Sequence, residues 1–140
     1  MTAGASWRHF PHEADIGIVG VGPTKAEAFR QAALGLTAVV TDPERVAQVE
    51  SVAVTCGAPD DDLLLVEWLD ALIYEMAVRR VVFGDYRVEI AGRELTAMAY
   101  GEPVDVERHE PAVEVKGVTL TALRVARLPD GWRAQCVVDV

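Results

Sequence analysis

The sequence contains only two cysteines, Cys56 and Cys136, and no long apolar run. No stretch approaches the ~20 apolar residues that span a bilayer, and residues 1–7 lack the basic start and apolar core of a signal peptide. The cysteines are 80 positions apart, which matches neither a disulfide framework nor a zinc-binding spacing. We therefore predict a cytoplasmic protein without a membrane segment, whose two thiols are small buried side chains.

Basic residues are also scarce. The 13 Lys and Arg residues are outnumbered by 22 Asp and Glu residues, so the formal net charge is -9. Binding to a nucleic-acid backbone depends on Lys and Arg replacing counterions. The charge balance therefore predicts no direct stable nucleic acid binding by this chain alone; where RNA is involved, a partner would hold it.

Several motifs of enzyme chemistry are missing. The chain has no G-x-x-x-x-G-K-[ST] loop, no G-x-G-x-x-G between a strand and a helix, and no G-x-S-x-G elbow. His12-Glu13 does not continue to the second histidine that H-E-x-x-H requires. A triad could be drawn from Cys136, His109 and Asp105, but any chain with three histidines permits such a drawing. The common nucleotide-binding and hydrolase motifs are therefore absent, and the residues by themselves indicate no reaction.

The composition is 51% hydrophobic and 25% charged, which is typical of a globular chain, and residues 1–140 are enough for one domain with its own core. Residues 14–20 alternate as in a strand. Thr24-x-x-Glu27 then forms a capping box that predicts a helix start. Apolar residues at helical spacing follow until residues 41–43, where Pro43 ends the helix.

The second half predicts one more helix and then strands only. Residues 49–56 alternate as in a strand, and the acidic run at residues 60–62 suits the positive end of a helix dipole. A metal site at that run is the alternative. After Arg80 the pattern predicts a β-meander over four strand-like segments: residues 81–90, 94–104, 113–127 and 132–140. The predicted fold class is α+β, a single domain with two helices packed on one face of a largely antiparallel sheet.

Isolated carboxylates in apolar strands are the candidate functional residues. Asp15 follows His12 closely, and Asp139 interrupts an apolar run just before Val140, which carries the terminal carboxylate. Two strand carboxylates brought together repel each other unless a cation lies between them. Oxygen ligands suit Ca²⁺ or Mg²⁺, and an added imidazole favours Mn²⁺ or Zn²⁺. The alternative is that both are solvated strand ends, one of them paired with Lys116.

Six segments follow one another along the chain in a fixed order. They are His12-Glu13-Ala14-Asp15-Ile16-Gly17; Glu27-Ala28-Phe29 with Ala32-Ala33; Leu64-Leu65-Val66-Glu67-Trp68-Leu69; Gly101-Glu102 with Asp105 and His109; Lys116-Gly117-Val118-Thr119; and Gly131-Trp132 with Asp139-Val140. Each alone is a weak signal, but together they extend from His12 to the last residue. This ordered set resembles the archease family.

The resemblance implies an accessory protein of the RtcB-type RNA ligase, which joins RNA ends in tRNA splicing and RNA repair. Such proteins promote guanylylation of a ligase histidine by GTP and support multiple turnover, through transient contact. The family's metal site, seen with calcium, matches Asp15, Asp139 and Val140, and Lys116 falls on the family's lysine near that site. His12, Asp105 and His109 join Lys116 as candidates for an accessory site.

Two positions depart from the family pattern. Glu13 stands where the family often has threonine, and Leu120 begins a segment where members often read Tyr-His-Glu-Leu. Both changes concern a surface that could touch the ligase. Two other functions stay open: a chaperone-like modulator of another RNA-processing enzyme, such as a tRNA methyltransferase, and a metal-dependent hydrolase that uses His12, His109 and the carboxylates.

Overall fold

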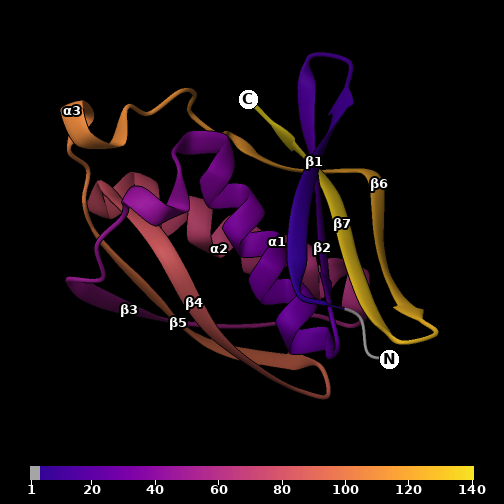
Figure 1. Cartoon of the computed structure of the whole chain (residues 1–140). Coiled ribbons are helices and arrows are strands. Elements are labelled where there is room, and N and C mark those ends of the chain that lie inside the picture. The colour runs from indigo at the N-terminus through magenta and orange to yellow at the C-terminus, as the bar shows by residue number, and fades with distance from the viewer. Residues whose placement is uncertain (1–3) are drawn as a thin grey trace.

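Two antiparallel sheets enclose two long helices in the computed structural model, which describes residues 4–140 (Figure 1). Residues 1–3, which begin the predicted domain, lie outside the described residues. One sheet has four strands, in the spatial order β1 (Ser6–His12), β2 (Asp15–Gly22), β7 (Gly131–Asp139) and β6 (Gly117–Leu128). The other has three, in the order β3 (Glu50–Gly57), β5 (Glu94–Pro103) and β4 (Val81–Ala91).

The helices α1 (Lys25–Val40) and α2 (Asp61–Arg79) lie between the sheets (Figure 1). Helix α1 contacts β1, β2 and β7 of one sheet and β4 of the other, and α2 contacts β6 as well as the three-stranded sheet. Two short helices, η1 (Pro43–Arg45) and α3 (Val106–His109), lie in the connections. Each sheet therefore buries its inner face against the helices, which confirms the α+β class.

The start and end of α1 follow from local sequence. The Thr24 hydroxyl accepts the backbone N–H of Glu27 at 3.1 Å, and Thr41 ends the helix just before Pro43. The Glu27 carboxylate does not complete a capping box; it binds Arg30 at 2.6 Å instead. The helix was thus predicted correctly, with one of the two expected capping contacts.

The acidic run before α2 is a helix cap, as its position predicted. The Asp60 carboxylate accepts the backbone N–H of Leu63 at 2.8 Å, and Arg80 ends the helix in a left-handed conformation, with φ of 54°. Trp68, on the buried face of α2, donates its ring N–H to the Phe29 carbonyl of α1 at 3.1 Å. This bond satisfies a polar atom in the core and joins the two helices.

The predicted meander is wrong in its connectivity. The hairpins β4–β5 and β6–β7 do form, but they belong to different sheets, where β5 also pairs with β3 and β7 also pairs with β2. Turn residues specify a hairpin locally, whereas the strand on the other side is chosen by long-range packing. The sequence reasoning also missed β1, and β6 begins at Gly117 rather than at residue 113.

No helix within residues 4–140 is both long enough and apolar enough to cross a membrane.

Candidate functional site

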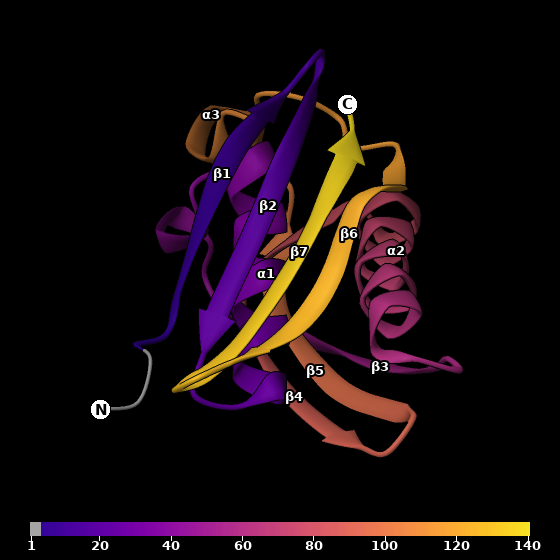
Figure 2. The same cartoon turned by 90° about the vertical axis from the view of Figure 1, so that its right-hand side faces the viewer.

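The register of the four-stranded sheet brings three predicted site residues to one end of it. His12 pairs with Asp15 across the β1–β2 hairpin. Strands β2 and β7 pair Ile16 with Val138, so the next position of the same register sets Asp15 opposite Asp139. Figure 2 shows this end of the sheet at the top, where the β1–β2 hairpin and the C-terminus of β7 lie. We call the positions His12, Asp15 and Asp139 the carboxylate row.

The carboxylate row faces away from the core. Ile16 and Val138, the neighbours of the two aspartates, pack in or against the core cluster, so alternation along a strand turns Asp15 and Asp139 to the outer face. Asp139 is exposed and Asp15 is half-buried. Like charges directly opposite one another on a sheet repel. A pair with one exposed and one half-buried carboxylate is therefore open to a cation from solvent.

Lys116 contacts the carboxylate row through its backbone. Its N–H donates to the Asp139 carbonyl at 2.8 Å, while its side chain is exposed. Among residues 4–140, no ion pair joins the Lys116 ammonium to Asp15 or Asp139. The backbone of Lys116 is thus fixed beside Asp139, while its ammonium stays exposed.

The donor atoms of the carboxylate row fit a hard divalent cation, because Asp15 and Asp139 offer carboxylate oxygens. No group of three or more His, Cys, Asp or Glu side chains in the described part of the chain is close enough to hold a metal ion. A cation here would therefore need backbone oxygens as well, and those of Val140 directly follow Asp139. His12 adds an imidazole position at the end of the row.

The two departures from the expected pattern flank the carboxylate row. Glu13 lies exposed in the β1–β2 turn with φ of 54°, a left-handed conformation that is uncommon outside glycine. On the other side, the pairing of β6 with β7 shifts register between Thr119 and Arg124. Leu120 lies in this bulge with 69% of its surface exposed. Both positions are thus accessible to a partner that contacts the row.

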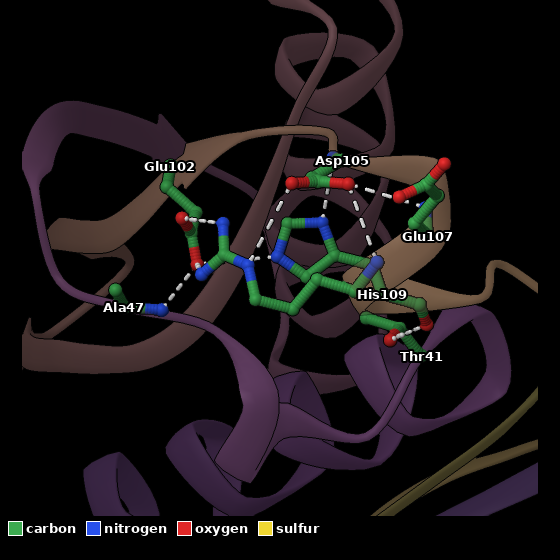
Figure 3. Close-up of polar contacts among 7 residues, drawn as sticks. Thr41, Ala47, Glu102, Asp105, Glu107 and His109 are labelled. Carbon is green, nitrogen blue, oxygen red and sulfur yellow. Dashed lines mark hydrogen bonds and ion pairs between the residues drawn. The ribbon is translucent and has the colours of Figure 1, made fainter.

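Asp105 and His109 belong to a different cluster, around α3 (Figure 3). His109 is 1% exposed, and its Nδ1 accepts the backbone N–H of Asp105 at 2.8 Å. The ring proton is therefore on Nε2, which lies 3.1 Å from Glu102 Oε2. In Figure 1, α3 is well separated from the C-terminus, so the structure does not bring Asp105 and His109 to the carboxylate row.

Glu102 is the centre of this second cluster, and sequence reasoning gave it no role. Hydrogen bonds from the Arg108 guanidinium, the Ala47 backbone N–H and His109 lower the pKa of Glu102 to about 2. The Thr41 hydroxyl donates to the His109 carbonyl and ties the cluster to the end of α1. All these bonds are internal, which indicates a structural function. The only signal in the sequence was the place of Glu102 in the acidic segment 101–105.

The drawn triad of Cys136, His109 and Asp105 does not form. Cys136 lies on the inner face of β7, and burial raises the pKa of its thiol to about 12, with a smaller effect of Asp70. Both ring nitrogens of His109 are already hydrogen-bonded, one to Glu102 and the other to the Asp105 backbone N–H. Cys56 and Cys136 are both free thiols; Cys136 is buried, as predicted, and Cys56 is half-buried.

The fold and the carboxylate row define a small two-sheet α+β protein with an exposed pair of aspartates at one sheet end. Comparison with known proteins identifies the family to which this chain is similar. The model of the archease protein family (MTH1598/TM1083) matches residues 7–140. The protein archease of Thermococcus gammatolerans is 42% identical over 139 residues, which cover 96% of this chain and 98% of the relative. The chain therefore belongs to the archease family.

Solved structures agree with this fold. The solution structure of Methanobacterium thermoautotrophicum protein 1598 aligns with a TM-score of 0.85 and 30% identity, covering 96% of this chain and 99% of that one. The crystal structure of an archease from Thermotoga maritima, described as a possible chaperone, aligns with a TM-score of 0.60 and 16% identity, covering 95% and 96% of the two chains. The second likeness shows the fold alone.

Proposed function

We propose that this protein is an accessory activator of an RtcB-type RNA ligase. It promotes the GTP-dependent guanylylation of the ligase and its multiple turnover in tRNA splicing or RNA repair, and it catalyses no reaction itself. Membership of the archease family supports the accessory role. The observation that carries the proposal is the register that sets Asp15 opposite Asp139 on an exposed sheet end.

In this proposal, Asp15, Asp139 and the backbone oxygens of Val140 hold a divalent cation, Ca²⁺ in the first place, with Mg²⁺ or Mn²⁺ as alternatives. When bound, the cation supplies positive charge that can orient phosphate oxygens. The backbone of Lys116 lies beside Asp139 and its side chain is exposed, so in this proposal its ammonium can meet a phosphate or a ligase carboxylate. These residues act from the surface, so they can reach into the active site of another protein.

The net charge supports a transient encounter with a basic partner. A chain of charge -9 is attracted to a positively charged RNA-binding cleft, and such steering raises the association rate more than the lifetime of the complex. Short-lived contact also suits an activator, because permanent occupation of an RNA channel would block the substrate.

The test is multiple-turnover RNA ligation by a cognate RtcB-type ligase at limiting enzyme concentration, with GTP and Mn²⁺. The protein should raise the number of turnovers, and Asp15→Asn and Asp139→Asn should each abolish the stimulation. Asp130→Asn is the matched control, because Asp130 is exposed in the turn at the opposite end of the same sheet. Equal stimulation by all three variants would show that the carboxylate row is not the functional site.

A second function has one observation in its favour: the Thermotoga maritima neighbour is described as a possible chaperone. In this alternative, the protein modulates another RNA-processing enzyme, such as a tRNA methyltransferase. Absence of any stimulation by the wild-type protein, with an active ligase, would favour it. Co-purification from the native host then decides, since the recovered partner is a ligase under one proposal and a methyltransferase under the other. Turnover of a phosphoester by the isolated protein would instead indicate a hydrolase.

A further inference from the structure

Within residues 4–140, no helix or second sheet lies over the outer face of the four-stranded sheet (Figure 2). Its side chains follow from the register, which forms cross-strand rows beyond the carboxylate row. The next row is Phe10, Gly17, Val137 and Thr119. The two after it are Arg8, Val19, Gln135 and Arg124, and then Ser6, Val21, Arg133 and Ala126. We call these three rows the outer face.

The apolar residues of the outer face are shielded by their own neighbours. Val19 is 1% exposed and Val137 is 0% exposed, although neither belongs to the core cluster. A Cβ on Gly17 would lie 2.2 Å from Phe10 Cζ, so the Phe10 ring extends over that glycine. The outer face is therefore a closely packed platform with one half-buried aromatic ring.

Three arginines stand on this platform without acidic partners. Arg8, Arg124 and Arg133 form no ion pair and no side-chain hydrogen bond within the described residues, and the buried Nε of Arg133 has no partner there. Of the ten cations elsewhere in the chain, six form ion pairs with carboxylates, and Arg80, Arg93, Lys116 and Arg127 form none within the described residues, so what sets the three arginines apart is their common face. The three rows of the outer face contain no Asp or Glu.

We propose that the outer face binds the phosphate backbone of single-stranded RNA. Arginine offers planar, bidentate donors that match phosphate oxygens. Arg8 and Arg124 occupy opposite edges of one row, about 14 Å apart because three strand spacings separate β1 from β6. A four-stranded sheet of this width accommodates two or three nucleotides. The choice of RNA over DNA rests on the proposed function.

A single strand fits this surface better than a duplex or an acidic peptide. The outer face is four strands wide and carries no helix within the described residues, so it does not fit into the groove of a duplex, which admits one helix or a two-stranded ribbon. The Phe10 ring, one row from Arg8, offers a surface on which a base can stack, and an acidic peptide would not use it. The strand would then run toward the carboxylate row, which adjoins Phe10 through His12.

Binding by the outer face must be weak in isolation, since the whole chain carries a charge of -9. This agrees with the expectation that the chain holds no nucleic acid stably by itself. A partner that already grips the RNA would raise its effective concentration at the outer face. The outer face therefore guides an RNA strand that a partner holds, and it is not the primary binding site.

The first measurement is a titration of the ¹⁵N-labelled wild-type protein with hexauridylate, followed by NMR. The amides of the outer face should shift, and the affinity should fall with salt. Neutralisation of three phosphates gives a slope of log K against log salt of about -2 for a single strand, or roughly a 15- to 20-fold loss between about 50 and 200 mM. No binding by the wild-type protein, or binding without salt dependence, would overturn the proposal.

The second measurement compares two triple variants of equal net charge. The test variant changes the outer face: Arg8→Gln, Arg124→Gln and Arg133→Gln. The control variant changes arginines at the end of α2 and on the three-stranded sheet: Arg80→Gln, Arg87→Gln and Arg93→Gln. We expect at least a tenfold loss of hexauridylate affinity for the test variant and less than twofold for the control, with circular dichroism showing that both fold. Equal losses would overturn the proposal.

Two further ligands distinguish RNA binding from binding of an acidic polypeptide or of DNA. Hexaglutamate bound more tightly than hexauridylate would assign the outer face to an acidic polypeptide instead. Hexathymidylate is expected to bind no more tightly than hexauridylate, and tighter binding would overturn the assignment to RNA. These titrations contain no ligase and leave Asp15 and Asp139 intact. A failure of ligase stimulation and a failure of RNA binding are therefore distinguishable.

Discussion

Asp70, in the middle of α2, accepts the backbone N–H of Val118 at 3.0 Å, although the two residues are 48 positions apart in the chain. Asp62, two turns earlier on the same helix, accepts the N–H of Val125 at 2.7 Å. Strand β6 is the edge of its sheet, so these N–H groups have no strand partner. Helix α2 thus covers part of the free edge and fixes β6 beside the carboxylate row (Figure 2).

Asp70→Ala should loosen this edge. We expect a loss of about 1 kcal/mol in the free energy of unfolding, because one charge-assisted hydrogen bond is removed at a partly wet site. Hydrogen exchange at the Val118 amide should speed up more than exchange in the β2–β7 pair. The measurement is amide exchange by NMR together with urea unfolding. Unchanged protection at Val118 would mean that the helix does not hold the strand.

Asp139→Asn should change the free energy of unfolding with opposite signs in the absence and presence of metal. Without metal, the variant should be more stable by a few tenths to 1 kcal/mol, since it removes a like charge opposite Asp15. With Ca²⁺ at about 100 times its dissociation constant, the wild-type protein should gain about 2.7 kcal/mol and the variant much less. Thermal unfolding with EDTA and with Ca²⁺ tests this. A wild-type protein indifferent to Ca²⁺, Mg²⁺ and Mn²⁺ would contradict the metal site.

Glu102→Gln should flatten the acid limb of the stability curve. The carboxyl has a pKa of about 2 in the folded protein and 4.5 as its ordinary value, so below pH 4.5 the unfolded chain binds the extra proton. The stabilisation by Glu102 is complete above pH 4.5 and is lost as the pH falls toward 2. The stability gap between wild type and variant should therefore shrink over that window. Urea midpoints at several pH values measure it.

The control for this pH dependence is Glu89→Gln, because Glu89 is a surface carboxylate whose side chain is 69% exposed and only weakly paired with Arg87. Its stability difference from wild type should stay small and nearly constant with pH. If Glu102→Gln showed the same flat difference, the ion-pair cluster around α3 would have no part in acid stability.

Gly20→Ala should disrupt the contact between β2 and α1. An added Cβ would lie 2.3 Å from the Ala28 carbonyl oxygen and 2.4 Å from the Ala32 nitrogen, so the helix would have to move. We expect a cost of about 1–3 kcal/mol or more in the free energy of unfolding. Gly4→Ala is the control, since its Cβ would meet nothing within 4 Å. Chemical unfolding of both variants gives the comparison, and equal stabilities would contradict the close approach.

Local elements of this fold were predictable because their signals are local. Thr24 and Asp60 mark the two helix starts by capping chemistry, and the structure has both. Strand β1 escaped prediction because its inward-facing residues stay exposed: Trp7 and His9 lie outside the core cluster, and the His9 ring is hydrogen-bonded to the Gly35 carbonyl of α1. The polar and aromatic residues of β1 give little alternation in hydropathy. Membership of two sheets rather than one was likewise invisible to local patterns.

For the candidate site, the sequence indicated Asp15 and Asp139 because each interrupts an apolar strand. It could not tell that Asp105 and His109 belong elsewhere, since distance along the chain says nothing of which loop folds back to which strand. In the sequence, Arg8, Arg124 and Arg133 are far apart and show no relation to one another. The net charge of the whole chain was therefore the only electrostatic signal, and it predicted no stable binding of nucleic acid. Their common face follows from the pairing of four strands.

The sequence by itself determined the two helices, most strands, the α+β class and the two aspartates that stand out in apolar segments. These depend on hydrophobic periodicity and capping, which act over a few residues. Only the tertiary structure decided that Asp15 lies opposite Asp139, although the two residues are 124 positions apart in the chain. It also decided that three arginines share one uncovered sheet face. Such pairings between distant strands are fixed by the packing of the whole core, because a shift of one residue would turn every side chain to the other face.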